Sequence, residues 1–309
     1  MALKSIANGA AVIDFTDADR WMEMAKKYRM TMPGDSYQGF DVDFGFGIDT
    51  RENCIATNEE RAKQKWGMGF GEVIKIAYAE VERHAKEKGW PKRSYYFLDE
   101  PRPEYRNVDS CRELIEFYVK NAPGTTFSGY YSPGAGRDPY FKLMPLSIAH
   151  HSEESLKTAV ESGHLAWTYS AVGGHLFGAW LELARSKGLT GFTTGFYYPC
   201  SIPYYDFSDV EGAWGLCLPS KNGINPTVEW ERLADRIDDY RYIKTLRMRA
   251  AAWKSAGDAN AAMAAEAEKL LNDTSKLVSV EPHGTPAVDA AGWRAWRSGI
   301  VACIEKMSP

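Results

Sequence analysis

The chain has 309 residues, and 44% of them are hydrophobic, which suffices to bury a large core in one α/β barrel or in two ordinary domains. Its net charge is -4 and its Lys and Arg residues are scattered, so neither nucleic acid nor an anionic membrane is an expected partner. No Pro-, Ser- or Gly-rich linker divides the sequence, which favours one folded body.

Aromatic residues and cysteines narrow the class of protein further. The chain has ten Trp and seventeen Tyr, many in loop-like stretches. Flat apolar faces with polar edges suit sugar rings, although most of these residues are expected to fill the core. The five cysteines are widely spaced and form no Cys-x-x-Cys pair, which argues against a disulfide framework and a structural zinc. We expect no metal and no other cofactor.

The sequence leaves the location of the protein open. No run approaches the roughly 18 apolar residues of a membrane helix. The first residues carry one lysine and too short an apolar segment for a secretory signal. The chain is therefore expected in the cytoplasm, or outside the cell if a signal has been removed. The oligomeric state is not indicated.

Short apolar strands alternate with amphipathic helices through residues 1–225. Strands are expected at Ala10–Phe15, Ser94–Asp99, Thr125–Tyr131, Leu143–His150, Leu165–Ser170, Leu189–Tyr198 and Trp214–Leu218, and Arg29–Pro33 is a further candidate. Helices are expected at Asp17–Tyr28, Gly69–Lys88, Glu104–Asn121, Ser152–Ser162 and Gly174–Lys187. Thr16 and Ser152 are expected to cap two of these helices. Residues 34–57, rich in Gly, Asp and Phe, are expected to form an excursion or a small hairpin.

This repeated strand–helix order implies parallel βαβ units. A (β/α)8 TIM-like barrel is favoured over an open sheet, because several strands end in aromatic or ionisable residues and such a barrel keeps its site at one ring of strand ends. No Gly-x-Gly-x-x-Gly turn follows an early strand, which argues against a dinucleotide-binding fold.

The pattern becomes helical from Asn225 to the end of the chain. Helices are expected at Thr227–Ala252, Asp258–Leu271 and Ala287–Lys306. In the first of them, Trp230, Leu233, Ile237, Tyr240, Ile243 and Leu246 are expected to form an apolar stripe, and charged residues such as Arg236 a solvated face. We therefore expect residues 1–225 to form the catalytic barrel and residues 226–309 a helical extension packed on it.

Two adjacent carboxylates, Asp99 and Glu100, follow a buried strand and precede Pro101. Adjacent residues suit the opposed carboxyl pair of an ordinary glycosidase poorly. They suit a reaction in which the 2-acetamido oxygen of the sugar attacks the anomeric carbon, one acid orients that amide, and the other is the general acid/base. Neighbouring carboxylates also raise one pKa, which keeps one group protonated. The plainer interpretation, that Asp99 caps the next helix and Glu100 is a rim charge, stays open.

Other residues at strand ends are candidate substrate contacts. These are Tyr130, Tyr131, His150, His151, Trp167, Tyr169, Tyr197 and Trp214. Trp167, Tyr169 and Trp214 are expected to form the floor of a sugar subsite, and half of the paired tyrosines to lie in the core. Adjacent histidines on a strand diverge and no third ligand lies nearby, so hydrogen bonds to sugar hydroxyls are favoured over a metal site.

The motif Leu98-Asp99-Glu100-Pro101, together with the run from Trp230 to Ile243, resembles the catalytic domain of glycoside hydrolase family 123. This resemblance runs from about Val12 to the C-terminus. Family tails read closer to Arg-Asp-Gly-Ile-Glu-Asp-Tyr, whereas this chain has Ala-Asp-Arg-Ile-Asp-Asp-Tyr at residues 234–240. The resemblance implies a (β/α)8 barrel, retention by substrate assistance, Asp99 as the amide-stabilising residue and Glu100 as the acid/base. Members usually carry a preceding β-sandwich, and this chain starts near the second barrel strand, so an N-terminally incomplete barrel is expected.

The leading hypothesis is a retaining exo-β-N-acetylhexosaminidase, with galactosamine as the preferred sugar and a carbohydrate as the substrate. A second hypothesis keeps the glycosidase but pairs Glu100 with a distant carboxylate such as Asp14, Asp43 or Asp206. A third is a non-catalytic glycan-binding or structural barrel.

Overall fold

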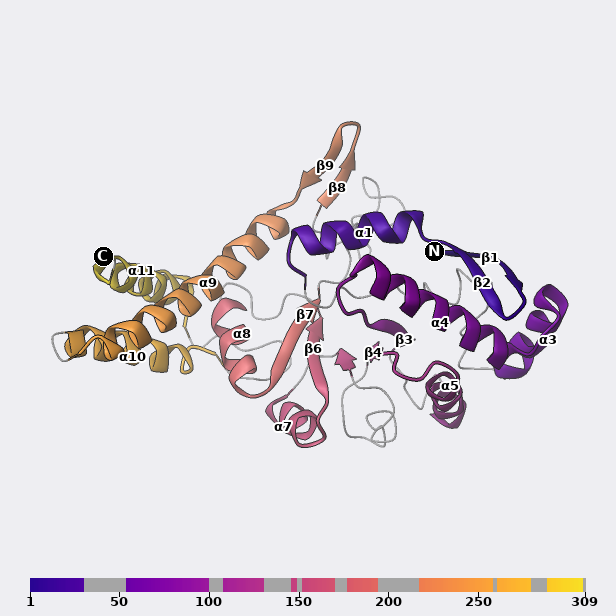
Figure 1. Cartoon of the computed structure of the whole chain (residues 1–309). Coiled ribbons are helices and arrows are strands. Elements are labelled where there is room, and N and C mark those ends of the chain that lie inside the picture. Colours follow the sequence, from indigo (N-terminus) through magenta and orange to yellow (C-terminus); the bar gives the residue numbers. More distant parts are fainter. Residues whose placement is uncertain are drawn as a thin grey trace. The chain divides into compact units, whose positions relative to one another are not determined.

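A computed structural model describes residues 1–30, 54–99, 108–130, 146–148, 152–169, 177–193, 217–257, 260–278 and 288–307 (Figure 1). The chain is mixed α/β and rich in helix, in agreement with the expected class. It divides into two compact units: unit 1 is residues 1–148 with 161–165, and unit 2 is residues 149–160 with 166–309. Among the described residues, no helix combines the length and apolarity needed to span a membrane.

Among its described residues, unit 1 combines a hairpin, four helices and three parallel strands. Its elements are β1 (Ala2–Ala7), β2 (Ala10–Asp14), α1 (Thr16–Lys27), α3 (Cys54–Trp66), α4 (Phe70–Lys88), β3 (Tyr95–Asp99), α5 (Val108–Asn121), β4 (Phe127–Tyr130) and β5 (Leu146–Ile148). β4 pairs in parallel with both β3 and β5. α4 precedes β3 and α5 connects β3 to β4, as the predicted βαβ order requires.

The N-terminal segment differs from its prediction. β2 is not a buried strand that opens a parallel unit, because it pairs antiparallel with β1 and its residues are partly exposed. Thr16 does not cap α1. Instead, the Asp14 carboxylate accepts hydrogen bonds from the Thr16 backbone N–H and hydroxyl, over 3.1 and 2.8 Å. The buried side of α1 carries Met22 and Ala25, whereas Trp21 and Met24 are exposed.

An aromatic cluster forms the centre of the unit 1 core. Tyr78 of α4, Tyr95 of β3, Tyr118 of α5 and Phe127 of β4 are buried, and their ring centroids lie 5.2 to 6.4 Å apart. α4 ends as predicted at Gly89, whose left-handed backbone (φ 59°, ψ 44°) suits glycine. Through this aromatic cluster, α4 and α5 pack against the amino-terminal halves of β3 and β4.

Unit 2 contains two parallel strands, a hairpin and five helices among its described residues. Its elements are α7 (Glu153–Glu161), β6 (Leu165–Tyr169), α8 (Phe177–Ser186), β7 (Leu189–Thr193), β8 (Cys217–Ser220), β9 (Gly223–Pro226), α9 (Val228–Ser255), α10 (Ala261–Thr274) and α11 (Ala290–Lys306). β6 and β7 are parallel and α8 lies between them in sequence. Ser152 caps α7 as predicted, because its hydroxyl oxygen accepts the Ser155 N–H over 3.2 Å.

α9 is the longest helix, and α8, α10 and α11 all pack on it. Close contact with α8 depends on Gly178, since a Cβ there would lie 2.6 Å from the Asp239 Cβ. The buried side of α9 carries Arg236 and Asp239 between Leu233 and Ile243. The expectation of a purely solvated charged face is therefore wrong at Arg236, and Trp230, expected on the apolar stripe, is 37% exposed.

Candidate active site

The carboxyl ends of β3, β4 and β5 lie in register in unit 1. Asp99 is the register partner of Tyr130, and Tyr130 is the partner of Ile148. The backbone thus brings the last residues of three strands to one edge, which is where parallel α/β proteins hold their ligands. Glu100 follows Asp99 directly, and His150 follows Ile148 by two residues; both lie outside the described residues.

β3 carries an irregularity just before Asp99. The pairing of β3 with β4 shifts between Tyr96 and Leu98, so that Phe97 is an extra residue on the β3 side. Bulges of this kind increase the local twist of a strand and are frequent beside active sites.

A cavity of about 380 Å³ lies at the opposite end of these strands. It is lined by Trp90, Arg93 and Thr126, among others, where β3 and β4 begin. Since β3 spans about 13 Å from Tyr95 to Asp99, this cavity is remote from the strand ends that carry the predicted acids. The Arg93 guanidinium lies over the Trp90 and Tyr95 rings, which gives it a packing role at this end.

The predicted residues of unit 2 lie on β6. Tyr169 is the last residue of β6 and the register partner of Thr193 at the end of β7. Trp167 lies against Gly191 of β7: a Cβ on Gly191 would lie 2.7 Å from the indole Cε2 and Nε1. The indole therefore occupies the space that a side chain on β7 would fill, and it is only half-buried.

Several predicted site residues fall in parts of the chain that the structure does not describe. They are Glu100, Tyr131, His150, His151, Tyr197 and Trp214. For Asp99, Tyr130 and Tyr169, the backbone alone is described. The alternative carboxylates Asp43 and Asp206 also lie outside the described ranges. The site as a whole therefore stays a prediction, supported by the register of Asp99 and Tyr130.

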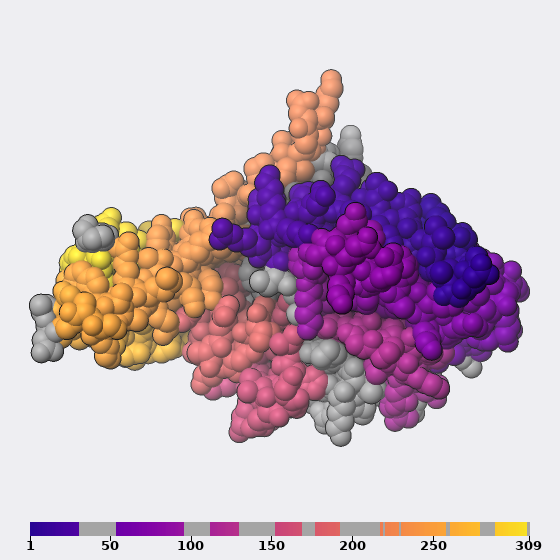
Figure 2. All heavy atoms as spheres, viewed as in Figure 1, coloured from indigo at the N-terminus to yellow at the C-terminus, as the bar shows by residue number. Residues whose placement is uncertain are grey.

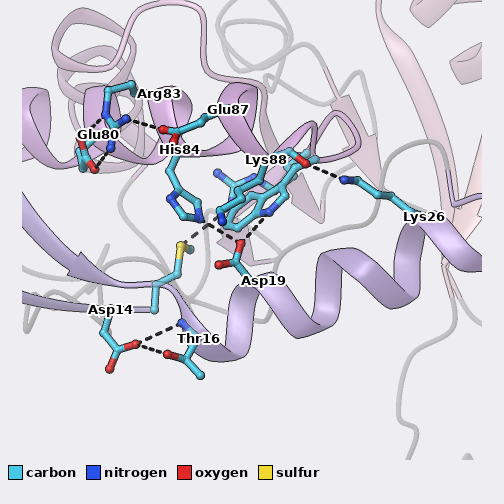
Figure 3. Close-up of polar contacts among 12 residues, drawn as sticks. Asp14, Thr16, Asp19, Lys26, Glu80, Arg83, His84, Glu87 and Lys88 are labelled. Atoms are coloured by element: carbon cyan, nitrogen blue, oxygen red, sulfur yellow. Dashed lines mark hydrogen bonds and ion pairs between the residues drawn. The ribbon is translucent and has the colours of Figure 1, made fainter.

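A polar cluster that the sequence did not predict joins α1 to α4 (Figure 3). His84 Nε2 lies 2.9 Å from Asp19 Oδ1, and Trp90 Nε1 donates to the same oxygen over 3.0 Å. The Phe15 ring stacks on His84, with centroids 3.8 Å apart. The ring face of His84 and the carboxylate of Asp19 are thus already in contact with other side chains. The cluster also lies near the start of β3, away from the predicted acids at its end, so we assign it to packing.

Asp14, one of the alternative catalytic carboxylates, is engaged in the same region. Hydrogen bonds from Thr16 and the Lys4 ammonium, 3.6 Å away, hold the pKa of Asp14 below its usual value. Its Oδ1 thus accepts both hydrogen bonds from Thr16 at the start of α1 (Figure 3), and its Oδ2 faces Lys4. This arrangement is typical of a structural carboxylate.

Asp239 of α9 is the most strongly buried carboxylate among the described residues, with 1% of its surface exposed. Trp293 Nε1 donates to its Oδ2 over 2.8 Å, and Arg297 Nε lies 2.9 Å from its Oδ1. Burial nevertheless raises the pKa of Asp239 to about 6, against the lowering effects of Trp293 and Arg297. It was missed because its partners come from α11, more than fifty residues later.

Metal-ligating groups are not gathered among the described residues. No group of three or more His, Cys, Asp or Glu in those ranges could hold a metal ion. Cys54, Cys217 and Cys303 are buried. Burial also raises the pKa of the Cys303 thiol, which opposes formation of a thiolate.

Comparison with known proteins gives one family. The family model described as "Glycoside hydrolase 123, catalytic domain" matches residues 1–187. No curated protein matches the chain. Among solved structures, dihydrodipicolinate synthase from Oceanobacillus iheyensis is 9% identical with a TM-score of 0.27, over 99% of this chain and 94% of that chain. A TM-score this low does not establish a shared fold.

Proposed function

The chain belongs to the glycoside hydrolase 123 catalytic-domain family and is a glycoside hydrolase, and we propose that it is a retaining exo-β-N-acetylhexosaminidase that prefers galactosamine. Its substrate is a carbohydrate with a terminal 2-acetamido sugar. The observation that carries the proposal is the adjacency of Asp99 and Glu100 where β3 ends. Parallel pairing in both units also supports a TIM-like (β/α)8 barrel, incomplete at the N-terminus, as part of this proposal.

In the proposed reaction, the substrate supplies the nucleophile. The 2-acetamido oxygen attacks the anomeric carbon while the bond to the leaving oxygen breaks, and Glu100 gives its proton to that oxygen. The Asp99 carboxylate accepts a hydrogen bond from the amide N–H and so stabilises the cyclic oxazolinium. Glu100 then removes a proton from water, which attacks the anomeric carbon and reopens the ring. Two inversions at this carbon give overall retention.

The position of Asp99 favours this division of labour. The bulge at Phe97 precedes it, and its register partner Tyr130 provides a candidate contact at the adjacent strand end. A distant carboxylate has less support, because Asp14 is held by Thr16 and Lys4. The substrate-assisted reaction needs no second distant carboxylate.

Replacement of Glu100 tests the proposal. General acid/base assistance supplies about 10²- to 10⁴-fold, so Glu100→Gln is expected to lower kcat on 4-nitrophenyl β-GalNAc by that factor. Asp99→Asn is expected to lose activity as well. Glu113→Gln, on the exposed side of α5, serves as the matched control and should retain full activity. Full activity of Glu100→Gln would remove this residue from the mechanism.

A second arm separates the substrate-assisted reaction from its alternative. The 2-hydroxy analogue, 4-nitrophenyl β-galactoside, lacks the internal nucleophile and is expected to remain intact. A stable thiazoline analogue of the cyclic intermediate is expected to inhibit competitively, because it resembles the transition state. Rapid hydrolysis of the galactoside would favour a distant carboxylate, and binding of GalNAc without turnover of any glycoside would favour a glycan-binding role.

A further inference from the structure

Positive charge gathers at the cavity of about 380 Å³ where β3 and β4 begin in unit 1. Among the described residues that line it, Lys86, Lys92 and Arg93 are cationic and Glu82 alone is anionic. We propose that this cavity binds a phosphate group, carried by a small organic ester or present as the free ion. The cavity is separate from the proposed glycosidase site, because it lies at the opposite end of β3 from Asp99.

Arg93 provides a buried charge in the wall of the cavity. Only 4% of its side chain is exposed. Its guanidinium carbon lies 4.8 Å from the centroid of the Trp90 ring and 4.6 Å from that of the Tyr95 ring, so these rings hold it in place before any ligand binds. A guanidinium stays charged when buried, and its field is screened less there than in water.

Glu82 offsets only part of this charge. Its Oε1 accepts a hydrogen bond from the Tyr95 hydroxyl over 2.9 Å and lies 3.6 Å from Arg93 Nη2. The carboxylate is thus engaged with the wall of the cavity. Three cations and one carboxylate leave a formal charge of +2 on the described lining, which matches the charge of about −1.5 to −2 on a phosphate ester at neutral pH.

The two lysines are free to bind a ligand. Lys86 lies in the last turn of α4 and Lys92 lies just before β3, and both are exposed. Neither has an ion-pair or hydrogen-bond partner within the part of the chain that the structure describes. An ammonium group is a point charge on a flexible stem, so both lysines can turn toward one phosphate. Figure 2 shows α4, in purple, at the surface of unit 1 beside α1, in indigo.

The carboxyl end of α4 also borders the cavity, and open carbonyl groups there would repel an anion. These carbonyl groups are bonded instead. The Trp90 N–H donates to the Ala85 carbonyl oxygen over 2.8 Å. The Lys26 ammonium donates to the Lys88 carbonyl oxygen over 2.6 Å (Figure 3). Both hydrogen bonds reduce the negative partial charge beside the cavity.

The cavity has room for more than a phosphate ion. Its volume falls within the range of about 300–1,000 Å³ that is common for small-molecule sites. Trp90 and Pro91 contribute apolar surface to its lining, and Thr126 is a buried polar residue there. A phosphorylated sugar combines apolar C–H groups with hydroxyl groups, so we expect an ester of this class rather than the free ion. A nucleic acid would need a longer basic surface, which a chain of net charge -4 with scattered Lys and Arg does not offer.

The test is calorimetric titration of the full chain with glucose 6-phosphate, with glucose as the neutral match. Glucose 6-phosphate is expected to bind and glucose is not, and the affinity should fall at least threefold between about 20 and about 200 mM NaCl. Lys86→Gln and Lys92→Gln are each expected to weaken binding about threefold, and the double variant about tenfold. Lys88→Gln removes the same charge from the same end of α4 but outside the cavity lining, so it should bind as the wild type does.

Equal affinity for glucose and glucose 6-phosphate would overturn the site, and so would equal binding by the wild type and the double lysine variant. Inorganic phosphate separates the two sources of the phosphate group: weaker binding than the ester supports an organic ligand, and equal binding supports a site for the free ion. Circular dichroism must show equal folding of all variants. Because no glycoside is present, a titration without binding overturns this site and leaves the proposed hydrolase function standing. Conversely, binding by a chain that hydrolyses no glycoside supports the site while the proposed function fails.

Discussion

At Asp239 a single carboxylate is taken out of water and held by two donors from another helix. Trp293 donates a hydrogen bond to Oδ2 and the Arg297 guanidinium forms an ion pair at Oδ1, which has no hydrogen-bond partner; burial prevails and the pKa rises to about 6. The pKa of Arg297 also rises, because Asp239 and Asp235 outweigh its own burial. The pair therefore orients α11 on α9 through specific geometry, and its net contribution to stability at neutral pH is small or unfavourable.

The sign of this shift predicts how stability depends on pH. The folded pKa of about 6 exceeds the reference value of 3.8, so the folded state holds its proton after the unfolded state has lost it. This group's contribution to stability is fully present below pH 4 and is lost as the pH rises to about 6. A shift of this size corresponds to about 3 kcal/mol.

Asp239→Asn is expected to remove this pH dependence. The free energy of unfolding, measured by urea titration at pH 4.5 and pH 7, should fall less with rising pH in the variant than in the wild type. Asp238→Asn, at a neighbouring and more exposed position that pairs with Arg241, is the control and should keep the wild-type slope. Equal slopes in Asp239→Asn and the wild type would contradict the assignment.

At the scale of elements, replacement by alanine is expected to have opposite effects on stability at two glycines in helices of unit 2. Gly178 of α8 faces the α9 backbone, where a Cβ would lie 2.8 Å from the Arg236 carbonyl oxygen and the Tyr240 nitrogen. Gly299 of α11 has only the Leu270 Cδ2 near, at 3.6 Å, an ordinary contact. Moving the packed backbone of α9 away from a new Cβ costs free energy. At an open position in a helix, in contrast, alanine is more favourable than glycine.

Gly178→Ala is therefore expected to destabilise the chain by about 1–3 kcal/mol, because α8 and α9 must separate. Gly299→Ala is expected to stabilise it by up to about 1 kcal/mol through helix propensity. Thermal unfolding of both variants measures the difference. An unchanged or raised melting temperature of Gly178→Ala would show that the α8–α9 contact is less close than described, and a lowered one of Gly299→Ala would contradict the open site there.

Sequence periodicity predicted most of the long elements, and turn chemistry accounts for two that were missed. The helices at Gly69–Lys88 and Thr227–Ala252 match α4 and α9 closely, because their apolar residues recur at helical spacing. β1 was missed, although Asn8 and Gly9, both with positive φ, form the Asn-Gly signal of a tight hairpin. The second missed strand, β9, follows the same signal at Asn222 and Gly223. The helix α3 was not predicted either.

Only those features of the candidate site that depend on residues close in sequence could be predicted. Asp99 at the end of a strand follows from the apolar run before Pro101, and the structure places the strand end there. The burial of Asp239 was not predictable, because it depends on α8 and α11, and a charged residue at helical spacing is ordinarily solvated. For the same reason, the link from His84 of α4 to Asp19 of α1 was invisible in the sequence.

At the scale of the whole molecule, the expected division at residues 225 and 226 stays a prediction, and α8 provides its test. All residues from Phe177 to Leu181 are buried. A helix that packs only against a sheet would bury one of its faces and expose the other. Because this part of α8 is buried on all sides, a second element must pack on it. α9 is that cover, because it packs along α8.

Residues 1–225 produced alone are therefore expected to be insoluble or to lack a cooperative thermal transition. Removal of residues 226–309 exposes the side of α8 that includes Gly178 and leaves its apolar neighbours in water, at about 25 cal/mol for each Å² of apolar surface. The full chain carrying Gly299→Ala serves as the control and should unfold cooperatively. Solubility, circular dichroism and calorimetry measure the outcome. If residues 1–225 were soluble, cooperatively folded and as active as the full chain, the helices after residue 225 would form an appendage that the catalytic unit does not need.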